Sequence, residues 1–203
     1  MKEFSKVLGF ELPRSVCLNF EYKVPVQCGR GPASQTDLML ISGEVCVAIE
    51  AKFTEPKYET VAQWLVKGKD IENRKKVLKG WLGLLSPELK ETDVADLTYQ
   101  LIHRAASACY PKAKSHHLVY QVFDVNSAQK EEYLCDLQIL RGLVSPDRLS
   151  IHLVECSIRR TSLQKCLERR WDEGERFFHE PVLCGLKNGE LIDVELKNTS
   201  TIK

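Results

Sequence analysis

The first quarter of the chain alternates apolar and polar residues in the pattern of β-strands. Residues 14–26 place apolar side chains at every second position, and residues 45–53 are rich in β-branched residues. Between them lie residues 27–36, predicted to be a glycine-containing loop, and the short apolar run 37–41. Ser42-Gly43-Glu44 then supplies turn-forming residues. The pattern predicts three strands, the last two joined as a hairpin.

The rest of the chain alternates between helical spacing and strand-like apolar runs. Apolar residues recur at helical spacing in 57–85, which predicts two helices, and in 93–109, which predicts one amphipathic helix. The later predicted elements are a strand at 117–124, a helix at 127–141, a strand at 149–156 and a helix at 162–171. Helical connections imply parallel pairing, whereas a hairpin is antiparallel. We therefore expect an α/β fold with a mixed β-sheet flanked by helices.

The two ends of the chain are expected to add little to this sheet. Residues 1–9 are predicted to form a short helix, a hairpin is predicted around Asn188-Gly189, and residues 198–203 are expected to be frayed. No repeat or linker interrupts the pattern. We therefore expect one domain, 1–203, with a helical insertion at about 57–85.

The composition indicates the general class of protein but says little about the chemistry it carries out. A hydrophobic fraction of 43% and a charged fraction of 28% are typical of a soluble globular protein. No apolar stretch is long enough to span a bilayer and none resembles a signal peptide, so a cytoplasmic protein without a membrane partner is expected. The eight cysteines are scattered without a C-x-x-C pair, which disfavours structural zinc and predicts reduced, mostly buried thiols.

Charge and motifs narrow the function classes further. The formal net charge is only +1, but Lys and Arg gather in residues 67–79 and 159–170. These two clusters either contact phosphates or form solvated helix faces. No P-loop, G-x-S-x-G or Rossmann glycine pattern is present, which disfavours a kinase, an esterase or a dehydrogenase.

One group of charged residues lies at the predicted hairpin. Asp37 opens its first strand, and Glu50-Ala51-Lys52 lies near the end of the second. Strand alternation puts Glu50 and Lys52 on one face and Asp37 within a residue or two of Glu50 across the hairpin. Two carboxylates suit a hard divalent cation, and a metal-bound water beside a lysine suits phosphodiester hydrolysis. The alternative is a solvated ion pair, because E-x-K tripeptides are common by chance.

A polar stripe on the predicted helix 93–109 offers further candidates. Gln100, His103, Arg104 and Ser107 follow helical spacing beside the apolar stripe. The stripe is either exposed to solvent or flanks the acidic site. In the second case, Gln100 and Arg104 contact the substrate backbone or orient Glu50. His103 is a weaker candidate for a general base, because Lys52 already fills that role.

These residues resemble the core motif of the PD-(D/E)xK nuclease superfamily. Residues 31–38 with 48–56 are similar to a block found in a group of bacterial proteins classed as restriction endonucleases, which carry an EAKFTEP-like sequence. Thr36 stands where a proline is common in the motif. The resemblance is specific over about residues 30–56 and looser to about residue 156. It implies a restriction-endonuclease-like core.

The resemblance also implies roles for individual residues. Asp37 and Glu50, with the Ala51 carbonyl, would hold Mg²⁺, for which Mn²⁺ is a substitute. Lys52 would orient or help deprotonate the attacking water. Gln35, Gln100 and Arg104 are assigned to substrate binding. The helix that precedes the first strand in the family often carries a further acidic ligand, for which Glu3 is a weak candidate.

The sequence therefore predicts a metal-dependent DNA endonuclease, in particular a restriction-type enzyme with DNA as its partner. A homodimer is compatible with this function, because cutting two strands often takes two active sites. Two alternatives stay open. One is a repair or recombination nuclease on the same core, and the other is a catalytically inactive module that binds nucleic acid or protein.

Overall fold

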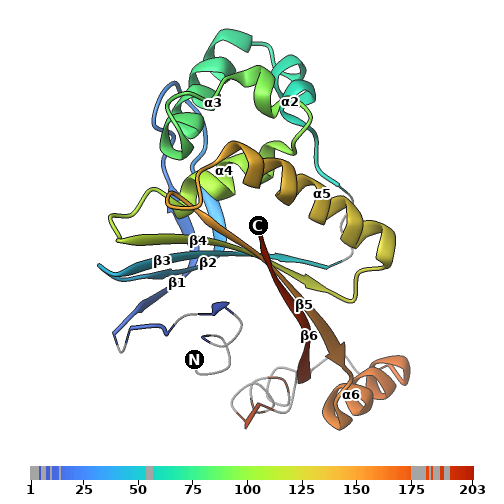
Figure 1. Cartoon of the computed structure of the whole chain (residues 1–203). Helices are drawn as coiled ribbons and strands as arrows, with labels where there is room; N and C mark the ends of the chain where they lie inside the picture. The colour runs from blue at the N-terminus through green and yellow to red at the C-terminus, as the bar shows by residue number, and fades with distance from the viewer. Residues whose placement is uncertain are drawn as a thin grey trace.

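A six-stranded β-sheet organises the chain (Figure 1). The computed structural model describes residues 5, 8, 9, 11–13, 15–53, 57–174, 182, 184, 188, 189 and 193–203. The strands are β1 (Cys17–Val24), β2 (Ser34–Ile41), β3 (Val45–Lys52), β4 (Ser115–Phe123), β5 (Ser150–Arg159) and β6 (Asp193–Ile202). The helices are α2 (Val61–Lys67), α3 (Ile71–Leu85), the 3₁₀ helix η1 (Glu91–Val94), α4 (Tyr99–Ala108), α5 (Ser127–Leu143) and α6 (Ser162–Asp172).

The sheet is mixed, and its strands lie in the order β1-β2-β3-β4-β5-β6. β1, β2 and β3 pair antiparallel, β3, β4 and β5 pair parallel, and β6 returns antiparallel to β5. The parallel pairs require crossovers, which are supplied by α2 to α4 before β4 and by α5 before β5. The predicted α/β fold with a mixed sheet flanked by helices is confirmed.

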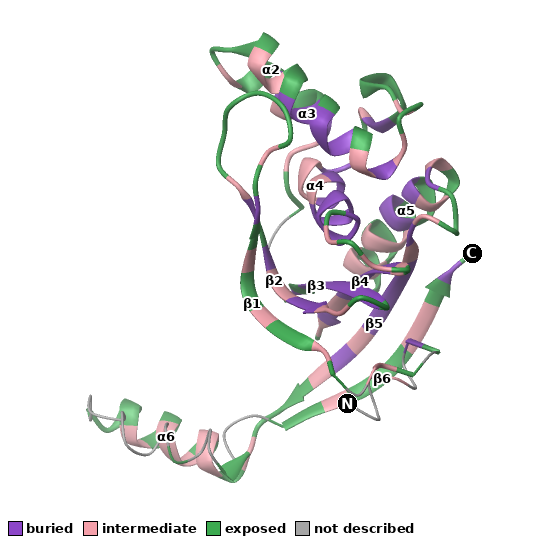
Figure 2. Cartoon of the chain, turned by 90° about the vertical axis from the view of Figure 1, so that its left-hand side faces the viewer, coloured by how far each residue is buried: buried purple, intermediate pink, exposed green. Residues whose placement is uncertain are grey.

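The sheet separates two apolar cores. On one face, α3, α4 and α5 bury side chains such as Trp81, Leu101 and Leu137 against the strands. A smaller core on the other face joins strand residues such as Val47 to Leu8 of the N-terminal segment. Buried residues concentrate in the central strands and in the helix faces that cover them (Figure 2).

Strand β3 shows how the alternating pattern positions the candidate site. Cys46 and Ala48 belong to the core beneath the helices, whereas Val45, Val47 and Ile49 belong to the opposite core. The next even-numbered residues, Glu50 and Lys52, are both buried. Glu50 makes a contact with α4, so the charged pair lies on the helix-covered face.

Helices α2 and α3 begin after residues whose side chains cap them. Thr60 accepts a hydrogen bond from Gln63 N in a capping box at the start of α2, and Asp70 accepts one from Asn73 N at the start of α3. Ser86 is the C-cap of α3, which therefore ends at Leu85, the predicted end of the helical segment 57–85. The two helices predicted within 57–85 are therefore confirmed, and the first of them begins at Val61.

Three sequence predictions differ from the structure. Residues 34–36, predicted as loop, belong to β2 and pair with β1. The helix predicted at 93–109 begins only at Tyr99, because Thr98 is extended and forms a β-bridge with Thr60. Residues 198–202 are not frayed: they pair with β5, and Ile202 is buried. Their polar sequence shows no apolar alternation because β6 is an edge strand, whose side chains are largely in contact with solvent.

Several expectations fall wholly or largely outside the described residues. These are the helix at 1–9 with Glu3, Thr54 to Pro56 of the resembling block, and the hairpin around Asn188-Gly189. All eight cysteines are free, but only Cys46, Cys109 and Cys156 are buried, so the prediction of mostly buried thiols is wrong. Among the described residues, no helix is both long and apolar enough to cross a membrane.

Candidate functional site

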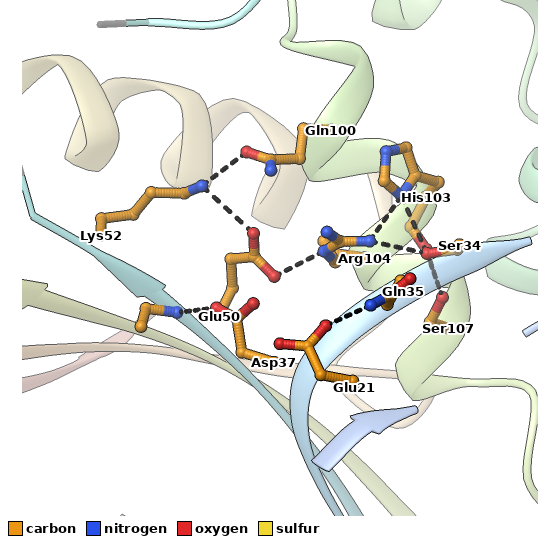
Figure 3. Close-up of polar contacts among 11 residues, drawn as sticks. Glu21, Ser34, Gln35, Asp37, Glu50, Lys52, Gln100, His103, Arg104 and Ser107 are labelled. Atoms are coloured by element: carbon orange, nitrogen blue, oxygen red, sulfur yellow. Dashed lines mark hydrogen bonds and ion pairs between the residues drawn. The ribbon is translucent and has the colours of Figure 1, made fainter. Parts of the chain in front are cut away.

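Three of the predicted site residues meet at one end of the β2–β3 hairpin. Leu38 pairs with Ile49, so Asp37 lies across from Glu50 on the neighbouring strand. The Asp37 carboxylate accepts a hydrogen bond from Ala51 N at 2.7 Å. Figure 3 shows the Asp37 and Glu50 carboxyl groups side by side, with Lys52 reaching back toward Glu50. The predicted placement of Asp37 within a residue or two of Glu50 is therefore correct.

Glu50 is a buried carboxylate held by two cations. Its side chain is 3% exposed, Lys52 Nζ lies 3.1 Å from Oε1, and Arg104 Nε donates to Oε2. A charge is retained in such a place only when it is paired and hydrogen-bonded. The interpretation as a solvated ion pair is therefore wrong for Glu50 and Lys52.

The electrostatic environment of Glu50 sets the affinity of the site for protons and cations. Burial raises the pKa of Glu50, the charges of Arg104 and Lys52 lower it, and the nearby Asp37 carboxylate raises it, with a net upward shift. Two neighbouring carboxylates resist being ionised together. A cation placed between Asp37 and Glu50 would remove that penalty.

Helix α4 holds the Lys52 side chain in place and supplies the Arg104 side chain that contacts Glu50. Gln100 Oε1 accepts a hydrogen bond from Lys52 Nζ at 2.6 Å, and Arg104 follows one turn later. Lys52 Nζ also lies 4.9 Å from the centre of the Tyr58 ring, within cation–π range. The polar stripe of this helix thus flanks the acidic site, as the second interpretation of the sequence proposed, and Arg104 orients Glu50.

A second hydrogen-bond network lies behind Arg104. Arg104 Nη1 donates to Ser34 Oγ at 3.0 Å, and Ser107 Oγ lies 2.9 Å from the same oxygen (Figure 3). His103 Nδ1 is 2.9 Å from Ser34 Oγ and 3.2 Å from Arg104 Nη1. Because arginine only donates, Nδ1 is the acceptor and the proton of the neutral ring is on Nε2.

This network disfavours His103 as a general base. Burial, Arg104 and Lys52 lower the pKa of His103 to about 3, so the ring is neutral at physiological pH. Its basic nitrogen is already occupied by Ser34 and Arg104. Ser107 belongs to the polar stripe that helical spacing predicts, whereas Ser34 carried no signal in the sequence, since its role depends on α4 lying across β2.

Gln35 lies apart from the three hairpin residues. It is exposed on β2, and its Nε2 donates to Glu21 Oε2. Glu21 has a positive φ of 51° at the position where the regular β1–β2 register is interrupted, opposite Asp37. Figure 3 places its carboxylate near Asp37. No pattern in the sequence points to Glu21, because a left-handed backbone at a non-glycine residue is rare and has no sequence signature.

The donor set fits a hydrated divalent cation better than a protein-enclosed one. No group of three or more His, Cys, Asp or Glu residues in the described part of the chain is arranged to hold a metal. Asp37 uses only Oδ2 in a hydrogen bond, so Oδ1 is available at a half-buried position. Mg²⁺ keeps several waters and uses one or two carboxylates. Asp37 and Glu50 could hold such an ion, with the Ala51 carbonyl as the further oxygen that the sequence predicts.

A cavity of about 220 Å³ opens on the far side of Arg104. It lies between the start of β2 and the helices α3 and α4. Its lining residues are Pro32, Ala33, Ser34, Gln35, Trp81, Tyr99, His103 and Arg104. Arg104 therefore connects the carboxylate site, through Nε, with the cavity.

Comparisons with known proteins identify a family without identifying an activity. The searches of curated proteins and of solved structures found no match. A family model described as "Domain of unknown function (DUF6946)" matches residues 1–160. The matched range contains all the site residues described above, from Glu21 on β1 to Ser107 on α4. The chain belongs to the DUF6946 family.

Proposed function

We propose that this protein is a Mg²⁺-dependent DNA endonuclease of restriction type, which hydrolyses phosphodiester bonds. The observation that carries the proposal is the convergence of Asp37, Glu50 and Lys52 on the helix-covered face at the end of the β2–β3 hairpin. The PD-(D/E)xK resemblance supports it, since the motif residues of that superfamily map onto these three positions.

Each residue has a role that follows from its position. When bound, Mg²⁺ lowers the pKa of a water ligand and stabilises charge on the phosphate oxygens. Asp37 and Glu50 supply the carboxylate ligands. Lys52, as an ammonium ion, orients the attacking water and helps to deprotonate it by stabilising the negative charge that develops on its oxygen. The proton passes to solvent as the water oxygen bonds to phosphorus. The P–O bond to the leaving sugar then breaks, and that oxygen is protonated by solvent.

Arg104 and Gln100 act on this site through its ligands. Arg104 keeps the buried Glu50 carboxylate ionised and oriented, and Gln100 holds the Lys52 ammonium in place. Both are therefore positioning residues in this proposal, in addition to the substrate contacts that the sequence suggested. Gln35, on the exposed side of β2, is available for a direct contact with DNA.

One observation favours a second candidate function. Both Glu50 oxygens already contact cationic side chains, so a metal ion must share them or displace Lys52. A site stabilised in this way without metal would suit a catalytically inactive module that binds nucleic acid or protein. The repair or recombination role differs from the first proposal only in the DNA that is cut.

Incubation of supercoiled plasmid with purified protein separates these functions. We expect nicked or linear product with Mg²⁺ or Mn²⁺ and none with EDTA. Asp37→Ala and Lys52→Ala should abolish the product, whereas Glu44→Gln, in the exposed turn before β3, should cut as the wild type does. Discrete fragments would indicate a site-specific enzyme. Intact plasmid under every divalent ion, or cleavage that survives Lys52→Ala, would contradict the proposal.

A further inference from the structure

We propose that the cavity beside Arg104 is a second phosphate subsite, which holds a backbone phosphate of the DNA strand next to the scissile one. The identity of the ligand as DNA rests on the proposed function. The anion-binding property of the cavity rests on its own geometry and charge. The subsite consists of Arg104, His103 and Tyr99, three of the residues that line the cavity.

The free polar groups of these three residues are hydrogen-bond donors. Arg104 uses Nε for Glu50 and Nη1 for Ser34, which leaves Nη2 without a partner among the described residues. His103 uses Nδ1, which leaves Nε2–H. Tyr99 Oη accepts from Trp81 Nε1 at 3.1 Å, so its own proton remains available. A phosphate group, which offers only acceptors at its charged oxygens, matches this set.

The donors of Arg104 and His103 reach accessible space. In the described part of the chain, Thr36 Oγ1 is the one fully buried side-chain nitrogen or oxygen atom without a hydrogen-bond partner. Arg104 Nη2 and His103 Nε2 are therefore not sealed in the protein interior. The Arg104 residue itself is only 8% exposed and is held by Glu50 and Ser34, so this donor is rigidly placed. A fixed guanidinium is suited to recognise a phosphate.

The charge of the cavity also favours an anion. Its described lining residues include an arginine and no carboxylate. Tyr99 is a protonated phenol, since burial raises its pKa to about 12. His103 contributes a neutral N–H dipole. A ligand with negative oxygens gains from all three groups, whereas a cationic ligand would meet only donors.

A nucleobase fits the same cavity less well. Tyr99 stacks on Trp64 with ring centres 3.7 Å apart and an interplanar angle of 7°, and the Arg74 guanidinium lies 4.8 Å from the centre of the Trp64 ring. Trp81 is 1% exposed. The aromatic faces that a base would need are thus already partly covered, while the donors at the cavity remain free.

The subsite is separated from the carboxylate site by one side chain. Arg104 contacts Glu50 on one side and lines the cavity on the other. A DNA backbone that places one phosphate at Asp37 and Glu50 can therefore place a neighbouring phosphate at Arg104. Two anchored phosphates would fix the strand relative to the metal ligands, which is the positioning that in-line attack requires.

Two substitutions of His103 test the subsite with a matched control. The asparagine amide in His103→Asn occupies the place of Nδ1, so it keeps an acceptor for Ser34 and Arg104 but removes the outer donor. The longer side chain in His103→Gln can place its amide N–H near the position of Nε2. Both variants are neutral and polar, so a difference between them reports the donor and not the charge.

Two readouts distinguish this inference from the proposed function. In the first, inorganic phosphate is titrated into the intact protein, and the His103 ring signals are followed by NMR after assignment with His103→Gln. In the second, a labelled DNA duplex that the wild type cuts, or random-sequence duplex if none is cut, is titrated with Ca²⁺ in place of Mg²⁺. We expect a saturable shift of the His103 signals, and a loss of duplex affinity of about tenfold in His103→Asn, but less in His103→Gln.

Failure of the subsite and failure of the nuclease function give different results in these experiments. A His103 shift with a protein that cuts no DNA would leave an anion site and overturn the nuclease. A protein that cuts DNA but shows no His103 shift, or equal duplex affinity in the wild type and His103→Asn, would overturn the subsite and leave the nuclease. If His103→Asn and His103→Gln lose affinity equally, the donor at Nε2 plays no part and the inference is wrong.

Discussion

At the scale of single residues, the ion pairs of Glu50 are the strongest constraint in the site. Its carboxylate is buried, and Arg104 and Lys52 contact one oxygen each. Removing one partner of a buried ion pair leaves an uncompensated charge, whereas removing both leaves none. The pair with Arg104 therefore links the stability of the fold to the chemistry of the site.

Replacement of Arg104 should reveal this link. We expect Arg104→Met to lower the free energy of unfolding by about 3 kcal/mol, measured by urea denaturation. The double variant Arg104→Met with Glu50→Gln should lose less than the sum of the two single losses, because the contact between the two side chains can be lost only once. A double variant that loses the sum of the two single effects would show that the two side chains do not interact.

Only some of the contacts in the candidate site could be predicted from the sequence. The proximity of Asp37, Glu50 and Lys52 followed from strand alternation and the length of the hairpin. The contact of Arg104 with Glu50 was one of two interpretations, because helical spacing does not fix which face meets the sheet. The Ser34 network could not be predicted, since it depends on the side-chain register between β2 and α4.

At the scale of elements, the β1–β2 loop docks on α3 through a close backbone contact. Arg30 and Asn73 exchange two hydrogen bonds, Arg30 N to Asn73 Oδ1 at 2.8 Å and Asn73 Nδ2 to Arg30 O at 2.7 Å. A Cβ at Gly80 would lie 2.8 Å from the backbone N of Cys28. Glycine at position 80 is therefore required by the approach of the loop, which also carries Pro32 and Ala33 of the cavity.

Two alanine substitutions on α3 should have opposite effects. Gly80→Ala introduces a clash with backbone and should lower the free energy of unfolding by about 1–3 kcal/mol. A Cβ added at Gly83, on the same helix, would meet no atom within 4 Å, so Gly83→Ala should raise stability by about 0.5–1 kcal/mol through helix propensity. Urea denaturation of both variants measures the difference. Equal stabilisation by both would disprove the close contact.

A buried histidine pair between β4 and β5 makes the stability of the fold depend on pH. His117 Nδ1 lies 3.1 Å from His152 Nε2, and His152 Nδ1 lies 3.2 Å from Thr201 Oγ1 on β6. Burial lowers the pKa of both rings to about 4, with a further lowering of the His117 pKa by the charge of His152. The unfolded chain therefore binds protons at a higher pH than the folded chain.

Because of this pair, the folded protein should become less stable as the pH falls. Stability from the neutral rings is complete above the unfolded pKa of about 6.5 and is lost as the pH falls toward about 4. We expect His152→Gln to flatten the decline of the unfolding free energy with pH in this range, measured by urea denaturation at several pH values. Lys114→Gln, which removes an exposed ion pair, should leave the slope unchanged. An unchanged slope in His152→Gln would refute the assignment.

Element boundaries show where sequence patterns lose information. Apolar alternation and helical spacing located β3, β4, β5, α3 and α5 because each buries one face or both. Alternation also located β1, although Val24 is the one residue of this strand that is buried. The start of α4 was missed, since Val94 and Leu97 continue the apolar spacing although Thr98 is extended. The second half of β6, predicted to be frayed, was missed because pairing with β5 defines this segment and apolar alternation does not.

At the scale of the whole molecule, the mixed sheet places the site where antiparallel and parallel pairing meet. β3 pairs antiparallel with β2 and parallel with β4, and it contributes Glu50 and Lys52. α4, on the crossover between β3 and β4, covers both residues with Gln100 and Arg104. The connection that parallel pairing requires thus also supplies the side chains that orient the candidate ligands.

The claim on which the account depends is that Asp37 and Glu50 hold a divalent cation despite Lys52 and Arg104. Titration of Mn²⁺ into the protein, followed by the electron paramagnetic resonance signal of free Mn²⁺, measures this directly. We expect saturable loss of the free-ion signal with the wild type and with Glu44→Gln, and recovery of that signal with Asp37→Asn. Full free-ion signal with the wild type, or equal binding by wild type and Asp37→Asn, would contradict it.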